Sequence, residues 1–292
     1  MKGLWFFLWG GFLFLNTSFC QNTANEFSVI SYNVWNGFES QVARRDTFVQ
    51  WAIRQDVDVI AFQELNGYTQ DSLEKLARKW GHPYAAIAKE NGYPVGISSK
   101  HPITNIHRLM EGMHHGGLYA EINGINFFVA HFSPLSSSKR LVEAKAVIAL
   151  LEQKNKLRER TIILGDFNAF SAHDSLFYKS TGLRERMYLK QKENPKLRNL
   201  NHSNKIDYQV IDSFLEKGFF DSFSLYHKEF DSSFPTKVFP SVSPDDYVKI
   251  DHMLLSKKMK RASVDVVLIK DSVTDTLSDH YPLKTIFKRK KQ

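Results

Sequence analysis

The segment 165–169, which reads Gly-Asp-Phe-Asn-Ala, places a carboxylate and a carboxamide two residues apart. It follows the apolar run 161–164, whose β-branched residues predict a buried strand that ends in a turn at the glycine. Side chains of an extended segment alternate between its two faces, so Asp166 and Asn168 share one side of the strand end. Together they could accept a proton and orient an oxygen atom.

Polar side chains recur at or near the ends of other apolar segments. Glu64 ends the segment 57–64, where its carboxylate could bind a hard cation through oxygen. Each of these residues taken singly also fits a surface turn, a solvated strand end or a core residue. Polar groups that converge from separate strand ends are nevertheless how α/β proteins build active sites. The other members of this set are Asn33 in 27–34, His131 in 125–132, Asp251 in 248–255, and the adjacent Asp279 and His280.

The order of these residues resembles the endonuclease/exonuclease/phosphatase superfamily, which has the DNase I-like fold. The resemblance extends over roughly residues 26 to 288, and the segment 96–103 also looks like the central hairpin strand of that family. It implies a four-layer α/β sandwich of two packed mixed β-sheets with helices on the outer faces, and a site at one rim. The matching segments are Ser-Tyr-Asn-Val at 31–34, Gln-Glu at 63–64, Ala-His-Phe at 130–132, Gly-Asp-Phe-Asn-Ala at 165–169, Ile-Asp-His at 250–252 and Ser-Asp-His-Tyr-Pro at 278–282.

The resemblance implies that water attacks a phosphate ester directly. Asp166 would orient or deprotonate this water, and Asn168 would hold a phosphate oxygen. His280, oriented by Asp251, would bind the phosphate or transfer a proton. His131 would donate to the negative charge of the transition state. Asp251 lies in an apolar segment, where an unpaired carboxylate is costly, so a cation-forming partner is expected.

The resemblance also implies a divalent cation, Mg²⁺ or Mn²⁺. Glu64 would hold it, with Asn33 close by and Asp279 as a possible further ligand. The chain has one cysteine, Cys20, so a structural zinc site is not expected. Such a cation would polarise the phosphoryl group and stabilise the leaving oxygen.

Two short segments depart from the DNA-repair members of the family. Trp35 stands where those members typically have Asp, and Leu65-Asn66 stands where they usually have Thr-Lys. An abasic-site repair role is therefore not expected.

The N-terminus has the pattern of a secretory signal. Lys2 is followed by an apolar run from Leu4 to Leu15, which is too short for a comfortable membrane span. We predict a signal peptide over 1–20 and export of the mature chain 21–292 as a secreted or periplasmic protein. The alternative is a lipoprotein signal ending at Cys20, although bulky Phe19 precedes it. In either case the mature chain has no disulfide.

Length and composition fit one catalytic domain over 21–292, because the matching segments run almost end to end. The formal net charge of +8 would allow an exported protein to meet polyanions or anionic lipid. The polar stretch 188–206 predicts a long surface loop. Strands are expected over 27–34, 57–64, 94–99, 125–132, 160–165, 248–255 and 263–269, and helices over 42–55, 70–80 and 138–154.

The substrate stays open at the level of sequence. A phosphate ester is expected, either nucleic acid, a phospholipid head group as in sphingomyelinase-like members, or a sugar or inositol phosphate. The aromatic segment 233–240 suits a lipid interface, and Phe234 and Phe239 packing under their loop is the alternative. A binding module with an inactive site is the non-enzymatic alternative. A monomer without a stable protein partner is expected.

Overall fold

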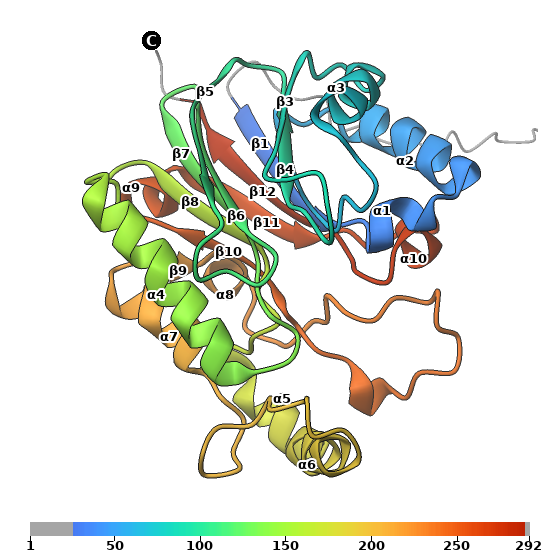
Figure 1. Ribbon diagram of the computed structural model, residues 1–292, viewed down its shortest axis with the longest axis vertical. Coiled ribbons are helices and arrows are strands. Elements are labelled where there is room, and N and C mark those ends of the chain that lie inside the picture. The colour runs from blue at the N-terminus through green and yellow to red at the C-terminus, as the bar shows by residue number, and fades with distance from the viewer. Residues whose placement is uncertain (1–25, 290–292) are drawn as a thin grey trace, which may run out of the picture.

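The computed structural model describes residues 26–289, in which two six-stranded β-sheets pack face to face (Figure 1). The first sheet has the order β11 (Ser263–Leu268), β12 (Leu283–Lys288), β1 (Glu26–Asn33), β2 (Val59–Gln63), β4 (Gly96–Ser99) and β3 (Tyr84–Ile87). The second has the order β5 (Ile103–Leu109), β6 (Gly117–Ile122), β7 (Ile125–His131), β8 (Thr161–Asp166), β10 (Asp251–Leu255) and β9 (Phe220–Asp221).

Both sheets are mixed, because β1 and β2 run parallel, as do β7 and β8, whereas the other pairs are antiparallel. Helices cover the two outer faces (Figure 1). The predicted four-layer sandwich is therefore confirmed.

Each outer face has its own apolar cluster. On the first sheet the covering helices are α1 (Trp35–Glu39), α2 (Val42–Gln55), α3 (Gln70–Arg78) and α10 (Thr274–Leu277). On the second sheet they are α4 (Ser137–Gln153) and α7 (Gln209–Glu216). Short helices α8 (Ser222–Tyr226) and α9 (Lys257–Ala262) add Phe223 and Met259 to the core between the sheets.

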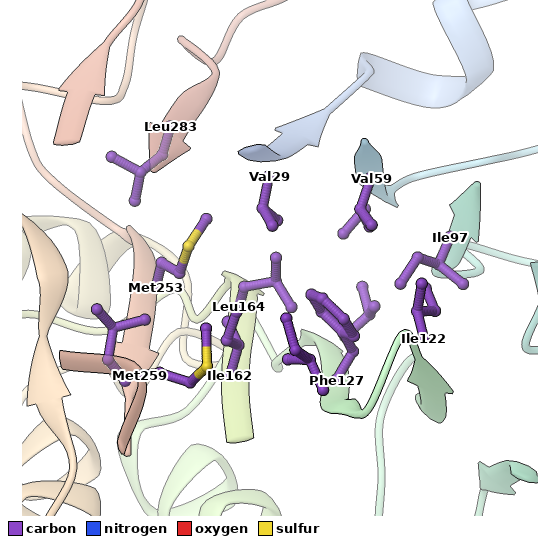
Figure 2. Close-up of a cluster of buried hydrophobic side chains, with 14 of the residues drawn as sticks. Val29, Val59, Ile97, Ile122, Phe127, Ile162, Leu164, Met253, Met259 and Leu283 are labelled. Carbon is purple, nitrogen blue, oxygen red and sulfur yellow. The ribbon is translucent and has the colours of Figure 1, made fainter. Parts of the chain in front are cut away.

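The core between the sheets joins side chains from both (Figure 2). Val29, Val59 and Ile97 from the first sheet face Phe127 and Leu164 from the second, and all five are fully buried. Each such side chain contributes about 1.5–3 kcal/mol of burial free energy. A chain with one cysteine has no internal disulfide, so this packing holds the sheets together.

Every predicted strand and helix has a counterpart in the structure, but five strands were not predicted. β3 and β9 are only four and two residues long, and β5 is exposed along most of its length, so none of these three shows a long apolar run. β6 begins at a glycine and contains Glu121. β12 does alternate, with Leu283, Thr285 and Phe287 buried. The segment 96–103 holds β4, which forms a hairpin with β3, and then crosses to the start of β5 in the other sheet.

The prediction of a surface loop over 188–206 is wrong for its first part. Helix α6 (Leu183–Glu193) continues through it and follows α5 (Ser175–Ser180). The residues of α6 have good helix propensity, but they are polar on nearly all sides and only Leu183 is buried, so the sequence shows no apolar stripe. The helix ends just before Asn194-Pro195, because a residue that precedes proline disfavours the helical conformation.

Two single-turn helices, at Ala172–Asp174 and Pro244–Asp246, complete the described elements. Within residues 26–289, no helix combines the length and the apolar character needed to cross a membrane. The predicted signal peptide at 1–20, with Cys20, lies outside the described residues.

Candidate active site

Strand register brings the polar strand ends to one end of the sandwich. Parallel pairing of β7 with β8 sets His131 opposite Asp166, and antiparallel pairing of β10 with β8 sets Asp251 opposite Asp166. In the other sheet, Asn33 at the end of β1 lies opposite Gln63, the residue before Glu64. The strand ends of both sheets therefore meet at one rim.

Gly165 permits the close approach of β7 and β8 at this rim. A Cβ atom at this position would lie 1.9 Å from the carbonyl oxygen of Ala130. Any larger residue would push the strands apart, and with them His131 and Asp166, which are paired in register. Gly165 is thus needed to place the next residue, Asp166, beside His131.

The carboxylate of Asp166 is the centre of the site. Its Oδ2 atom accepts a hydrogen bond of 3.1 Å from Asn33 Nδ2, and its Oδ1 atom accepts one of 2.8 Å from the backbone nitrogen of Asn168. The Nε2 atom of His131 lies 3.6 Å from Oδ2, and the Nε2 atom of His280 lies 3.8 Å from it. Two imidazoles and one amide therefore converge on one carboxylate oxygen.

The other nitrogen of His280 is held by Asp251. The distance from His280 Nδ1 to Asp251 Oδ2 is 2.8 Å, and both residues are buried. Burial lowers the pKa of His280, but the carboxylates of Asp251, Asp279 and Asp166 outweigh burial and raise that pKa well above its ordinary value. The imidazole of His280 is therefore cationic at neutral pH.

Burial shifts the pKa values of Asp166 and His131 in opposite directions. It raises the pKa of Asp166 to about 7, which the charges of Asp251 and Glu64 support and His280 opposes. It lowers the pKa of His131 well below its ordinary value, with neighbouring His115 acting in the same direction. His131 is therefore a neutral imidazole, and Asp166 changes charge near neutral pH.

Glu64 lies at the end of β2 and faces the same cleft. Its Oε1 atom accepts a hydrogen bond of 3.2 Å from Asn33 Nδ2, and its Oε2 atom accepts one of 2.9 Å from the backbone of Asn36. Glu64 has φ of 61° and Asn168 has φ of 47°, in the left-handed region that side-chain-bearing residues rarely adopt. Such strained conformations persist where the surroundings fix them, and they cluster at functional sites.

Asp279 also lines the cleft, and burial raises its pKa; the charge of His280 opposes this shift and the charge of Glu64 supports it. The preceding residue, Ser278, donates a 2.7 Å hydrogen bond to the carbonyl oxygen of Asn33. This bond fixes the segment that carries Asp279 and His280 to the end of β1. All eight predicted site residues thus lie at this rim.

The cleft has a volume of about 400 Å³. Three titratable side chains of its lining were not predicted, namely Tyr93, His114 and His115. The ring of His115 stacks on that of His131 at 4.2 Å, and Tyr93 meets His115 edge-on at 5.2 Å. The signal available in the sequence was the pair of adjacent histidines followed by two glycines.

The donors in the cleft fit a hard divalent cation. Glu64, Asp166 and Asp279 bring three carboxylates to it, and its lining residues include neither Lys nor Arg. Oxygen ligands of this kind suit Mg²⁺ or Mn²⁺. Over residues 26–289, no three His, Cys, Asp or Glu side chains are already arranged as a complete metal site. A cation here would take part of its coordination from water and substrate, as Mg²⁺ usually does.

A sequence model of one protein family matches residues 30–280. The chain belongs to the endonuclease/exonuclease/phosphatase family. This confirms the predicted family and supports phosphoesterase activity. No curated protein sequence matches the chain.

Solved structures of the same fold include nucleases. An AP endonuclease from Archaeoglobus fulgidus has a TM-score of 0.67 and 17% identity, with 89% of this chain and 99% of that chain covered. A 3'-5' exonuclease from Neisseria meningitidis has a TM-score of 0.64 and 19% identity, with 90% of this chain and 100% of that chain covered. A family protein from Bacteroides thetaiotaomicron has a TM-score of 0.59 and 18% identity, with 90% and 97% covered. At these identities the likeness establishes the fold alone.

Proposed function

We propose that this protein is an exported, divalent-metal-dependent phosphoesterase that hydrolyses a phosphate ester by direct attack of water. The observation that carries this proposal is the surrounding of Asp166, whose buried carboxylate faces His131, His280 and Asn33 at distances of 3.1–3.8 Å. A base, two imidazoles and an amide around one point can activate water and bind a phosphoryl group.

In this proposal Asp166 orients the attacking water and accepts its proton. The hydrogen bonds from Asn33 and from the backbone of Asn168 keep the carboxylate in one orientation. The side-chain nitrogen of Asn168 donates a hydrogen bond of 3.1 Å to the carbonyl oxygen of Phe132. A carboxamide nitrogen carries two hydrogens, so the second is free to bind a phosphate oxygen.

The two histidines have different roles because their charges differ. His280, kept cationic by Asp251, binds the phosphoryl oxygens and neutralises their charge. His131 is neutral, and its Nε2 atom points at the carboxylates of Asp166 and Glu64, which places the ring hydrogen there. It can then donate to the oxygens that become more negative in the transition state.

Glu64 and Asp279 are the proposed carboxylate ligands of Mg²⁺ or Mn²⁺. Asn33 turns its amide nitrogen toward Glu64, while its Oδ1 atom accepts a hydrogen bond of 3.0 Å from Trp35. Asn33 thus orients Glu64 in this arrangement instead of offering an oxygen to the cation. When bound, the cation would polarise the phosphoryl group and stabilise the leaving oxygen.

A phospholipid phosphodiesterase is the second candidate function. The observation that favours it is Phe239, which is 39% exposed and packs edge-on against Trp35 at 5.6 Å. Phe234, by contrast, is half-buried and packs against the ring of His280 at 4.9 Å. An exposed aromatic side chain near the cleft suits a lipid interface.

The experiment is a metal-dependent activity screen of purified residues 21–292. Substrates are DNA, RNA, sphingomyelin, inositol phosphates and bis-p-nitrophenyl phosphate, each with Mg²⁺ and with EDTA. Asp166→Asn should reduce turnover on the order of 10²-fold or more, the scale of a lost general base. Asp46→Asn, at an exposed position of α2, is the matched control. Hydrolysis in ¹⁸O-water should label the phosphoryl product in a single turnover. A trapped phosphoenzyme, or wild-type turnover by Asp166→Asn, would contradict the mechanism, and inactivity on every substrate would favour the binding module.

A further inference from the structure

A second cavity, of about 380 Å³, adjoins the catalytic cleft. Four residues line both spaces, namely Pro134, Asn168, Phe234 and Ile250. A molecule whose reacting phosphate lies beside Asn168 can therefore extend into the second cavity. We call it the Arg140 pocket, and its other lining residues include Arg140, Phe170, Met187, Lys190, Asn199 and Phe239.

Two segments that carry none of the proposed catalytic residues form part of the wall of the Arg140 pocket. Helix α6 and the loop after it contribute Met187, Lys190 and Asn199. The aromatic segment before β10 contributes Phe234 and Phe239. The pocket is thus apolar along much of its wall and basic on the side of α6.

Arg140, near the start of α4, is the unusual residue of this pocket. It is 2% exposed, and its Nη1 atom donates to the carbonyl oxygen of Ser133 at 3.0 Å and to Asn199 Oδ1 at 2.8 Å. Its Nε atom is buried and has no acceptor, and the guanidinium forms no ion pair with any residue from 26 to 289. A buried guanidinium with an unsatisfied donor is costly, and an anionic group bound in the pocket would offset this cost.

Arg140 keeps its charge at neutral pH. Burial lowers the pKa of its guanidinium to about 10, although carboxylates that include Asp207, Glu143 and Asp166 act in the opposite direction. Lys190 brings a second charge from the exposed face of α6, with no ion pair inside the described chain. The third cation of the lining, Arg186, is already paired with Asp246 at 3.0 Å.

We propose that the Arg140 pocket is a second substrate subsite, which binds a non-reacting phosphate or similar oxyanion of the molecule cleaved at Asp166. This inference rests on the proposed function for its link to the reaction, but not for the binding of the anion. The apolar wall that includes Phe170 would pack against the part of the substrate between its two anionic groups. An acyl chain alone would leave the guanidinium unpaired, which disfavours a purely apolar occupant.

The first test measures binding of inorganic phosphate to the mature chain by calorimetry, with no turnover required. We expect two sites per chain. Lys190→Glu should weaken one of them on the order of tenfold by charge reversal, whereas Lys192→Glu on the same helix but outside the lining should change neither. Arg140→Gln should abolish the same site if the variant folds. If it does not fold, the comparison of Lys190→Glu with Lys192→Glu tests the inference. A single site, or two sites that Lys190→Glu leaves unchanged, would overturn the inference.

The second test links the subsite to catalysis. The test compares two phosphodiesters of p-nitrophenol. They are identical except that the second alcohol group of one ester carries an additional phosphate. Lys190→Glu should lower kcat/KM on the order of tenfold for the ester with two phosphates, mainly through KM, and should leave the other within twofold. Equal effects on both esters would contradict a substrate role. If neither ester is cleaved but two phosphates bind, the anion site stands and the proposed function fails.

Discussion

The Nδ1 atom of His280 lies 2.8 Å from a carboxylate oxygen of Asp251. Asp251 begins β10 of the second sheet, and His280 lies in the segment between α10 and β12 of the first. This contact joins the two sheets across the rim of the sandwich. It also leaves the Nε2 atom of His280 directed toward Asp166.

Asp251→Asn should lower turnover and move the pH profile. The Asp251 carboxylate is the main influence that raises the pKa of His280 against burial, so its removal lowers that pKa. Activity that needs cationic His280 falls as the pH rises through this pKa, and in the variant the fall should come at lower pH. We expect kcat to drop on the order of 10²-fold. The measurement is kcat against pH, with Asp245→Asn as the exposed control. A pH profile identical to that of the unmodified protein would refute the role of Asp251.

Glu64→Gln should remove the response to divalent cations without disturbing the fold. The substitution keeps the shape of the side chain and removes the charge that would hold Mg²⁺ or Mn²⁺. Activity should no longer rise with Mg²⁺ concentration, and the melting temperature without metal should stay within a few degrees. Glu111→Gln, an exposed position outside the cleft lining, is the control. Full activity of Glu64→Gln at low Mg²⁺ would show that this carboxylate does not hold the cation.

His82 should make the fold less stable in mild acid. Its ring is buried between Ser98 Oγ at 2.8 Å and the carbonyl oxygen of Val57 at 2.9 Å, and burial lowers its pKa from 6.5 to about 4. The unfolded chain binds a proton below pH 6.5, whereas the folded chain binds it only near pH 4. The stabilisation is therefore present above pH 6.5 and is lost as the pH falls, by about 3 kcal/mol at pH 4.

The measurement for His82 is the unfolding free energy from urea titrations between pH 7 and pH 4. Other histidines also titrate in this range, so the difference between the unmodified protein and His82→Gln isolates this residue. His202→Gln, on an exposed loop, should leave the pH dependence unchanged. If His82→Gln keeps the full loss of stability in acid, the loss has another origin.

The predicted export can be tested by determining the N-terminus of the mature protein. Mass spectrometry of the protein from its native host should find Gln21 as the first residue. A diacylated Cys20 would instead identify a lipoprotein and retain export. Intact Met1 in a cytosolic fraction would contradict the predicted localisation.

Local sequence patterns were sufficient to predict most of the strands that carry the site. Runs of apolar residues mark β2, β7 and β8, and apolar residues interrupted by serines mark β1. Each strand ends at or next to a polar residue, because an active site needs polar groups where a buried strand ends. The spacing of Asp166 and Asn168 likewise follows from the chain itself. Helix α6 escaped prediction because burial of a single leucine leaves no periodic signal.

The pairing of these residues was decided by tertiary structure. The hydrogen bond from Ser278 to Asn33 spans 245 positions of the chain, and the hydrogen bond from Asn33 to Asp166 spans 133. Strand register and sheet packing set such contacts, and neither is encoded within one short segment. The same holds for the Arg140 pocket, where a helix, a loop and an aromatic segment enclose one unpaired guanidinium. The sequence by itself determined which groups are present, and the packing of the two sheets decided which of them meet.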